Sequence, residues 1–359
     1  MIRSGTVLVV IGMTVVLFLG TGLVAHQAWA DSPLPLRLGY QSSSADNWLL
    51  FTARDLKLFD GVGVALEFVP FDAGPPMIEA TKGKAIDMAI VKAMPFLIGL
   101  SEGADWVMIG IHSEGAYSEG LVARKDSGIL TPGDLGGKRI GYYKHSSAHY
   151  GLAMLLRQYG IPRDQVHLVN LSPPEQLAAL ANNEIDAAMV WEPWIQRMVH
   201  DTNARAIATE GDLGIYTNVA GIAVRREWLR HNRETAVRFL RALIMAYDAL
   251  EKDHSVAVHE MAREIGVEEE WVEQIYRDAP PPQLHLWADS RYAYSLVRGA
   301  AFHRRLGYLA KFLFDEQLLP RQVPTLDVLD ASVIVEALMT SKRDHAEEKQ
   351  DHAEIPGAR

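Results

Sequence analysis

The sequence predicts an α/β fold with two lobes, each built on a mostly parallel sheet, joined by two crossover strands. Short β-rich runs alternate with amphipathic segments over most of the chain, which is typical of a parallel sheet covered by helices. One segment of the first half is echoed ninety-nine residues later. With its ends set aside, the chain retains about 310 residues, more than one ordinary domain, so two lobes are expected.

The elements follow this alternation in order. In the first unit, strands are expected at 36–40, 64–69, 87–91 and 106–111, with helices at 48–58, 75–81 and 95–102. In the second unit, strands are expected at 138–143, 167–170, 187–190 and 205–208, with helices at 148–159 and 174–181. The rest is expected to be largely helical, at 234–251, 256–265, 268–279 and 289–315.

The echo relates two helix-to-strand turns. Residues 84–91 (Lys-Ala-Ile-Asp-Met-Ala-Ile-Val) resemble residues 183–190 (Asn-Glu-Ile-Asp-Ala-Ala-Met-Val), and a proline follows each. Short strands at 120–123 and 221–224 are expected to be the two crossings. We therefore expect one lobe at 31–121 and 222–330, and the other at 122–221.

Both ends of the chain are expected to lie outside the fold. Arg3, an apolar run at 7–24 and an Ala-Trp-Ala sequence at 28–30 match a cleavable signal peptide, residues 1–30. A periplasmic protein is expected, tethered to the membrane if uncleaved, because the run approaches the roughly 20 residues that span a bilayer. Residues 341–359 are charged and lack aromatics, which predicts a disordered tail.

Composition and motifs argue against several function classes. The net charge of −10 disfavours nucleic-acid binding, which needs cations against phosphates. There is no cysteine, so disulfides, thiol catalysis and Cys-zinc sites are excluded. Residues 259–263 lack the second His of a metalloprotease motif, and residues 132–139 lack the first Gly and the Ser/Thr of a phosphate loop. His145 and His149 have no evident third ligand, so no metal or cofactor is expected.

Polar and aromatic side chains follow the ends of four expected strands, where open α/β sheets bind ligands. Ser146 and Ser147 suit a helix cap as well as a ligand contact, and the tryptophans suit the core as well as the cleft. The candidate ligand-binding residues are Gln41, Lys92, Tyr117, Ser146, Ser147, Trp191, Glu192, Trp194 and Asn218. Hydroxyls, a cation, a carboxylate and rings together indicate a small polar ligand.

From Leu36 to Leu329 the chain resembles the substrate-binding proteins of the sulfonate/taurine/nitrate importer group, which also includes thiamine-pyrimidine binders. The motifs that carry the resemblance lie at 36–41, 71–80, 131–138, 144–149 and 191–193. It implies a type II periplasmic-binding-protein fold, closure around a solute and docking on an ABC permease. It also implies ligand contacts from Gln41, Ser146, Ser147 and Trp191, and a Glu192 carboxylate that pairs with a ligand amine.

One motif departs from this family. Residues 90–95 read Ile-Val-Lys-Ala-Met-Pro, where many sulfonate binders resemble Ser-Thr-Gly-Asp-Ile-Pro. Lys92 points either to the surface or into the cleft. If it points inward, it favours an anionic or zwitterionic ligand, with Glu192 at the opposite end. Since an unpaired buried charge is costly, the ligand or another residue must then compensate it.

The expected function is that of a non-enzymatic, monomeric solute-binding protein of an ABC importer. Its ligand is expected to be a small organic anion or zwitterion, alkanesulfonate or taurine-like, captured by hinge closure. The alternatives are a binder of nitrate, bicarbonate or a pyrimidine-type thiamine precursor, and a periplasmic ligand sensor. An enzyme on the same scaffold, similar to the related pyrimidine synthases, is disfavoured. That resemblance implies dependence on a cysteine-containing motif, and this chain has no cysteine.

Overall fold

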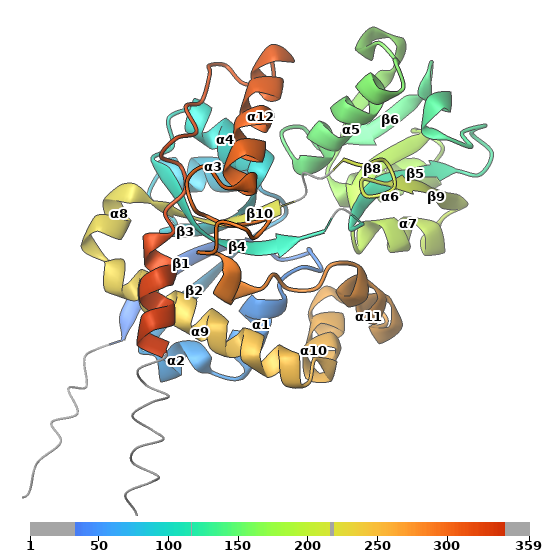
Figure 1. Cartoon of the computed structure of the whole chain (residues 1–359). Helices are drawn as coiled ribbons and strands as arrows, with labels where there is room; N and C mark the ends of the chain where they lie inside the picture. Colours follow the sequence, from blue (N-terminus) through green and yellow to red (C-terminus); the bar gives the residue numbers. More distant parts are fainter. Residues whose placement is uncertain (1–32, 116, 216–218, 342–359) are drawn as a thin grey trace, which may run out of the picture. The chain divides into compact units, whose positions relative to one another are not determined.

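The computed structural model describes residues 33–115, 117–215 and 219–341. The predicted signal peptide, the predicted tail beyond residue 341 and Asn218 lie outside these residues. The described residues contain two five-stranded sheets with helices packed on them (Figure 1). Within these ranges, the search for a helix long and apolar enough to cross a membrane finds none.

The first sheet has the strand order β2-β1-β3-β10-β4. Its strands are β1 (Leu34–Gln41), β2 (Val64–Phe71), β3 (Met88–Lys92), β4 (Trp106–Glu114) and β10 (Val219–Arg225). Strand β1 runs parallel to β2 and β3, whereas β10 pairs antiparallel with β3 and β4. The helices between its first strands are α1 (Trp48–Asp55), α2 (Leu58–Gly61), α3 (Pro75–Lys82) and α4 (Ala93–Ser101). We call this sheet and its helices the first lobe.

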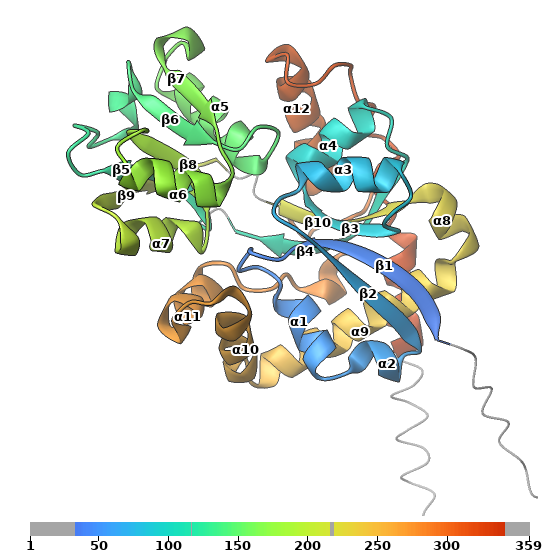
Figure 2. The same cartoon turned by 180° about the vertical axis from the view of Figure 1, so that it is seen from behind.

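The second sheet has the order β7-β6-β8-β5-β9. Its strands are β5 (Glu119–Arg124), β6 (Arg139–Tyr142), β7 (His167–Asn170), β8 (Ala187–Trp191) and β9 (Ala204–Thr209). Its helices are α5 (Ser147–Gln158), α6 (Pro173–Ala181) and α7 (Trp194–Asp201). We call this group the second lobe; its sheet begins at Glu119, before the predicted boundary at residue 122. Figure 2 shows the two sheets from behind.

The echoed turns have the same geometry in the two lobes. Lys84 and Asn183 both adopt a left-handed backbone, with φ of 57° and 60°. Asp87 accepts a hydrogen bond from the backbone N–H of Arg37 at 3.1 Å, and Asp186 accepts one from that of Arg139 at 2.9 Å. The predicted repeat is therefore confirmed at the level of local structure.

The C-terminal part is largely helical, as predicted, but with different boundaries. It contains α8 (Arg226–His231), α9 (Arg233–Lys252), α10 (Ser255–Ile265), α11 (Glu269–Asp278), α12 (Ala301–Asp315) and a helix at 332–341. The helix predicted at 289–315 is wrong in its first part: it begins at Ala301, because Ser295 and Trp287 form a turn in which the Ser295 hydroxyl donates to the Trp287 carbonyl. The predicted helix 48–58 breaks at Lys57, which has φ of 55°.

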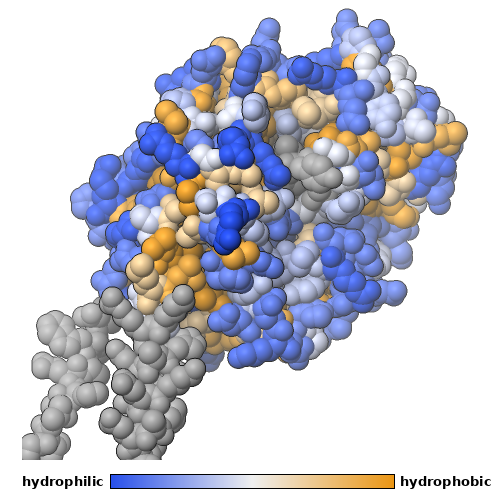
Figure 3. Space-filling view, viewed as in Figure 1, coloured by the Kyte–Doolittle hydropathy of each residue, from blue (hydrophilic) through white to orange (hydrophobic). Residues whose placement is uncertain are grey.

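Both lobes have large apolar cores on which the sheets and helices pack. Trp48, Trp106 and Trp287 are each at most 1% exposed. Helix α9 packs on β1 and β2, whereas α4 packs on β3 and β4, and α5 and α7 both pack on β5. Hydrophilic residues cover much of the face seen in Figure 3, with hydrophobic residues between them.

Candidate functional site

The predicted ligand loops lie at the carboxyl ends of three parallel strands, each directly followed by a loop or helix start. Gln41 ends β1, Lys92 ends β3 and Trp191 ends β8. Ser146 is the N-cap of α5: its hydroxyl accepts from the His149 backbone N–H at 3.4 Å and donates to the Tyr143 carbonyl at 2.7 Å. The capping role considered for Ser146 is therefore confirmed.

Lys92 points inward and has a counter-ion of its own in the first lobe. Its Nζ lies 2.7 Å from Asp46 Oδ2 and 3.3 Å from Ser113 Oγ. The Ser113 hydroxyl also donates to Asp46 Oδ2 at 2.6 Å. The Lys92 and Asp46 side chains are only 15% and 11% exposed. The compensating charge is thus Asp46, which the sequence analysis did not name, and the lysine does not point to the surface.

The electrostatics of this group are set by burial and by the lysine. Burial alone would raise the pKa of Asp46, but the attraction of Lys92 and the hydrogen bonds from Lys92 and Ser113 outweigh it and hold that pKa well below its usual range. His112, 1% exposed, has its pKa lowered to about 4, mainly by burial. At neutral pH the group is therefore an ion pair beside a neutral imidazole.

Two buried glutamates of the second lobe lie next to this ion pair. Glu119 and Glu210 are both 0% exposed, and the Glu210 backbone N–H donates to the Glu119 carbonyl at 2.8 Å. Burial raises the pKa of Glu119 to about 7, against the lowering effects of Lys92 and the Ser147 hydroxyl. Burial and the negative charge of Glu119 raise the pKa of Glu210 as well. We call Asp46, Lys92, His112, Ser113, Glu119, Ser147 and Glu210 the Lys92 cluster.

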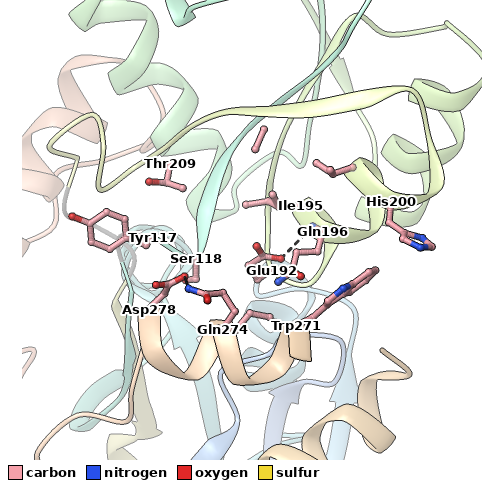
Figure 4. A pocket seen from close by; sticks show the side chains of 13 residues that line it. Tyr117, Ser118, Glu192, Ile195, Gln196, His200, Thr209, Trp271, Gln274 and Asp278 are labelled. Carbon is pink, nitrogen blue, oxygen red and sulfur yellow. Dashed lines mark hydrogen bonds between the residues drawn. The ribbon is translucent and has the colours of Figure 1, made fainter. Parts of the chain in front are cut away.

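A cavity of about 710 Å³ lies between α7 and α11. In Figure 4, Trp271, Gln274 and Asp278 rise from α11 toward Glu192 and Tyr117 above them. Ser118 and Thr209 also line it, and they directly precede Glu119 and Glu210 in the chain. Because consecutive side chains of a strand point to opposite faces, Glu119 and Glu210 point away from this cavity, toward Ser147 and Gly151 of α5.

Glu192 belongs to this cavity and not to the Lys92 cluster. Burial raises its pKa to about 7, against a hydrogen bond from the Gln196 backbone N–H at 3.3 Å. The negative charge of Asp278 raises it further. Lys92 and Glu192 therefore have different polar neighbours in this structure: Lys92 pairs with Asp46, and Glu192 accepts from Gln196. Their placement at opposite ends of a ligand stays a prediction.

The other predicted residues are distributed over both parts. Ser147 lies in the Lys92 cluster, and Tyr117, 49% exposed, lines the cavity. Trp191 and Trp194 are 6% and 7% exposed, and their indole nitrogens, like Gln41 Nε2, have no hydrogen-bond partner among the described residues. Such orphaned donors are unusual in a protein interior, and they leave N–H groups available near the strand ends.

Sequence reasoning missed five members of the Lys92 cluster: Asp46, His112, Ser113, Glu119 and Glu210. Asp46 lies in the polar loop that follows Gln41, at residues 42–46. Glu119 opens the strand that was interpreted as a crossing. An acidic residue at the start of such an apolar strand was the available signal. Among the described residues, no group of three or more His, Cys, Asp or Glu side chains could hold a metal ion.

A family model described as NMT1/THI5-like matches residues 45–255. A Bacillus subtilis relative, named for aliphatic sulfonate binding, is 25% identical over 91% of this chain and 95% of its own length. The taurine-binding periplasmic protein of Escherichia coli is 29% identical over 51% of this chain, which spans 57% of that relative's length.

Solved structures share the fold. The alkanesulfonate-binding protein SsuA from Xanthomonas axonopodis pv. citri, bound to MOPS, is 25% identical with a TM-score of 0.69, covering 83% of this chain and 98% of that one. The nitrate-binding protein NrtA from Synechocystis PCC 6803 (16% identical, TM-score 0.69, 85% and 88% covered) and the desulfurization enzyme DSZB (18%, 0.61, 85% and 99%) are also similar. The predicted fold class, two α/β lobes of the periplasmic-binding-protein type, is therefore confirmed.

Proposed function

Because the chain belongs to the NMT1/THI5-like family, we propose that it is the solute-binding component of an ABC importer and captures a small zwitterion between its two lobes. The names of its relatives support a sulfonate or taurine-like ligand. Export by the predicted signal peptide, residence in the periplasm and docking of a monomer on a permease belong to the same proposal.

The observation that carries the ligand class is the balance of charge in the Lys92 cluster. One lysine lies beside three carboxyl groups, those of Asp46, Glu119 and Glu210. A plain anion would find Lys92 already paired with Asp46, whereas an ammonium group beside Glu119 and Glu210, whose pKa values are raised, would favour their ionised form. A ligand with both a sulfonate and an amine would place the anionic end near Lys92 and the start of α5, and the ammonium near the glutamates.

Closure is the proposed mechanism of capture. Lys92 and Ser113 belong to the first lobe, and Glu119, Ser147 and Glu210 belong to the second. A ligand that contacts both groups stabilises the form in which the lobes are close, which shifts the open–closed equilibrium.

Calorimetric titration of the mature protein tests the proposal. We expect taurine to bind about tenfold or more tightly than ethanesulfonate, which has the same sulfonate but no amine, since a charged hydrogen bond contributes about 1.5–3 kcal/mol. We expect nitrate to bind more weakly than either. Equal affinities for taurine and ethanesulfonate would overturn the zwitterion class, and failure of every sulfonate to bind would overturn the sulfonate assignment.

A matched pair of variants locates the amine contact. Glu119→Gln is expected to weaken taurine binding about tenfold and to leave ethanesulfonate binding nearly unchanged, because only taurine has an ammonium group. Glu184→Gln removes an exposed acid of the same lobe and is expected to leave both affinities unchanged. If the two variants behave alike, Glu119 does not contact the ligand.

A further inference from the structure

A second cavity, of about 610 Å³, lies between α5 of the second lobe and the end of α12 of the first. Figures 1 and 2 both show these two helices side by side. Lys144, His149, Arg157 and Arg163 line it from the second lobe, and Glu316 lines it from the other side. Three cations therefore face one acid, and none of these residues belongs to the Lys92 cluster.

His149 gives this cavity a buried hydrogen-bond donor. The side chain is 2% exposed, and its Nδ1 accepts a hydrogen bond from the His145 backbone N–H at 3.2 Å. A neutral imidazole has one donor and one acceptor nitrogen, so the proton is on Nε2. That Nε2 has no partner among the described residues. A buried polar atom without a partner is rare and calls for an explanation.

The charge of the ring is settled by its surroundings. Burial, followed by the positive charges of Arg163, His145 and Lys144, lowers the pKa of His149 to about 3. The ring is therefore neutral at pH 7 and offers a fixed N–H rather than a charge. A bound anion would offset the repulsion among the positive charges that surround the ring.

Two of the three cations are uncompensated. Arg157 lies 3.5 Å from Glu316, and its guanidinium lies 5.4 Å from the centre of the Phe312 ring. Lys144 and Arg163, in contrast, form no ion pair within the described part of the chain and are exposed. The single acid of the cavity is thus already shared with Arg157, and the two remaining cations flank the free Nε2–H donor.

We propose that this cavity is a second binding site of the protein, which takes a small tetrahedral oxyanion, a phosphate or sulfate group. Lys144 and Arg163 supply the charge, and His149 Nε2 donates the buried hydrogen bond. Charge-assisted hydrogen bonds of this kind are the strong ones in anion recognition. The site is separate from the zwitterion site, because α5 presents Ser147 to the Lys92 cluster and His149 to this cavity.

Titration of the mature protein with inorganic phosphate, with sulfate and with methyl phosphate tests the proposal, at constant ionic strength and with no sulfonate present. We expect saturable binding of phosphate, with chloride ineffective. Tighter binding of methyl phosphate than of inorganic phosphate would identify the source as an organic phosphate, and the reverse order would identify the free ion. Absence of saturable binding by all three would overturn the proposal.

The variants make the assignment specific. Lys144→Gln combined with Arg163→Gln is expected to weaken phosphate binding by about tenfold or more, while Lys57→Gln combined with Lys125→Gln, which removes two exposed cations elsewhere, leaves it unchanged. Glu316→Gln is expected to tighten binding, because it removes the one acid among the described residues that line the cavity. Equal effects of the two double variants would show general surface electrostatics and overturn the site.

One further variant separates this proposal from the proposed function. Lys92→Gln is expected to weaken taurine binding and to leave phosphate binding unchanged. If phosphate binding is lost with Lys92 instead, the anion occupies the Lys92 cluster and the second site is wrong, whatever the outcome for taurine.

Discussion

At the scale of single residues, the burial of Lys92 is the feature with the largest energetic consequence. An ammonium group in a protein interior is costly unless it is paired and hydrogen-bonded. Asp46 and Ser113 meet both conditions, at 2.7 and 3.3 Å. The pair then leaves little net positive charge for a ligand, so a strong preference for plain anions is not expected from Lys92 alone.

The buried glutamate next to that pair makes stability depend on pH. The pKa of Glu119 is raised from 4.5 to about 7 in the folded protein, so the folded state holds a proton that the unfolded chain releases above pH 4.5. The stabilisation that this proton gives the folded state is complete below pH 4.5 and is lost as the pH rises through about 7. Glu119→Gln should therefore become more stable than the wild type over this window, by a few kcal/mol at about 1.4 kcal/mol per pKa unit.

Urea unfolding at pH 5, 6, 7 and 8 measures this difference. His112 and His149, with pKa values lowered to about 4 and 3, act in the opposite direction below pH 6.5. Their effect is common to both proteins and cancels in the comparison. Glu184→Gln serves as the control and should follow the wild type. A Glu119→Gln difference that stays constant with pH would contradict the raised pKa.

At the scale of elements, the repeated helix-to-strand turn holds an aspartate that links strands within each sheet. Asp87 joins β1 and β10 through Arg37 at 2.8 Å and Arg225 at 2.7 Å. Asp186 joins β6 and β5 through Arg139 at 2.8 Å and Arg124 at 3.3 Å. One carboxylate in each lobe thus links two strands, and a residue with a left-handed backbone lies three positions before it in the turn.

Removing these two carboxylates should give unequal losses. The Asp87 side chain is 7% exposed and that of Asp186 is 15% exposed. Asp87→Ala leaves the nearly buried Arg225 without its partner, for which about 3–5 kcal/mol is expected. Asp186→Ala should cost less, because its nearly buried partner Arg124 keeps the Asp126 carboxylate at 3.6 Å and the Asn183 side-chain oxygen as partners. Urea unfolding of both variants measures the order, and a larger loss for Asp186→Ala would contradict the argument.

The elements that the sequence predicted well are the β-rich runs, whether buried or partly exposed. The predicted strand 167–170 coincides with β7, and the other predicted strands lie within or largely overlap the observed ones. Helix α7 was missed because Trp194 follows Pro193 and was interpreted as part of a loop. The direction of Lys92 could not be predicted, since its partner Asp46 is forty-six residues away. Tertiary contacts of this range leave no local pattern.

At the scale of the whole molecule, the described contacts between the lobes lie on two sides, one at α5 and α12 and the other at α7, α10 and α11. Tyr150 meets Phe312 edge-on, with 5.2 Å between ring centres, and Arg157 lies 3.5 Å from Glu316. On the side of α7 and α11, Arg197 donates to the carbonyl oxygens of Ile265 and Gly266, and the His200 and Trp271 rings lie 5.3 Å apart beside the 710 Å³ cavity. The lobes therefore already touch on both sides in this structure, and a ligand would add to these contacts.

Closure can be followed by fluorescence energy transfer, because the chain has no cysteine and two introduced ones can be labelled alone. Lys57→Cys in the first lobe and Lys125→Cys in the second are both exposed. We expect taurine to change the transfer efficiency with the same midpoint as its calorimetric affinity. A shift from 1% to 99% closed needs about 10⁴-fold tighter binding to the closed form, so a partial shift is the expected result for a weaker preference.

Addition of Lys92→Gln should move the midpoint to higher taurine concentration. Calorimetric binding without any change in transfer would leave the solute-binding role standing and overturn closure as its mechanism.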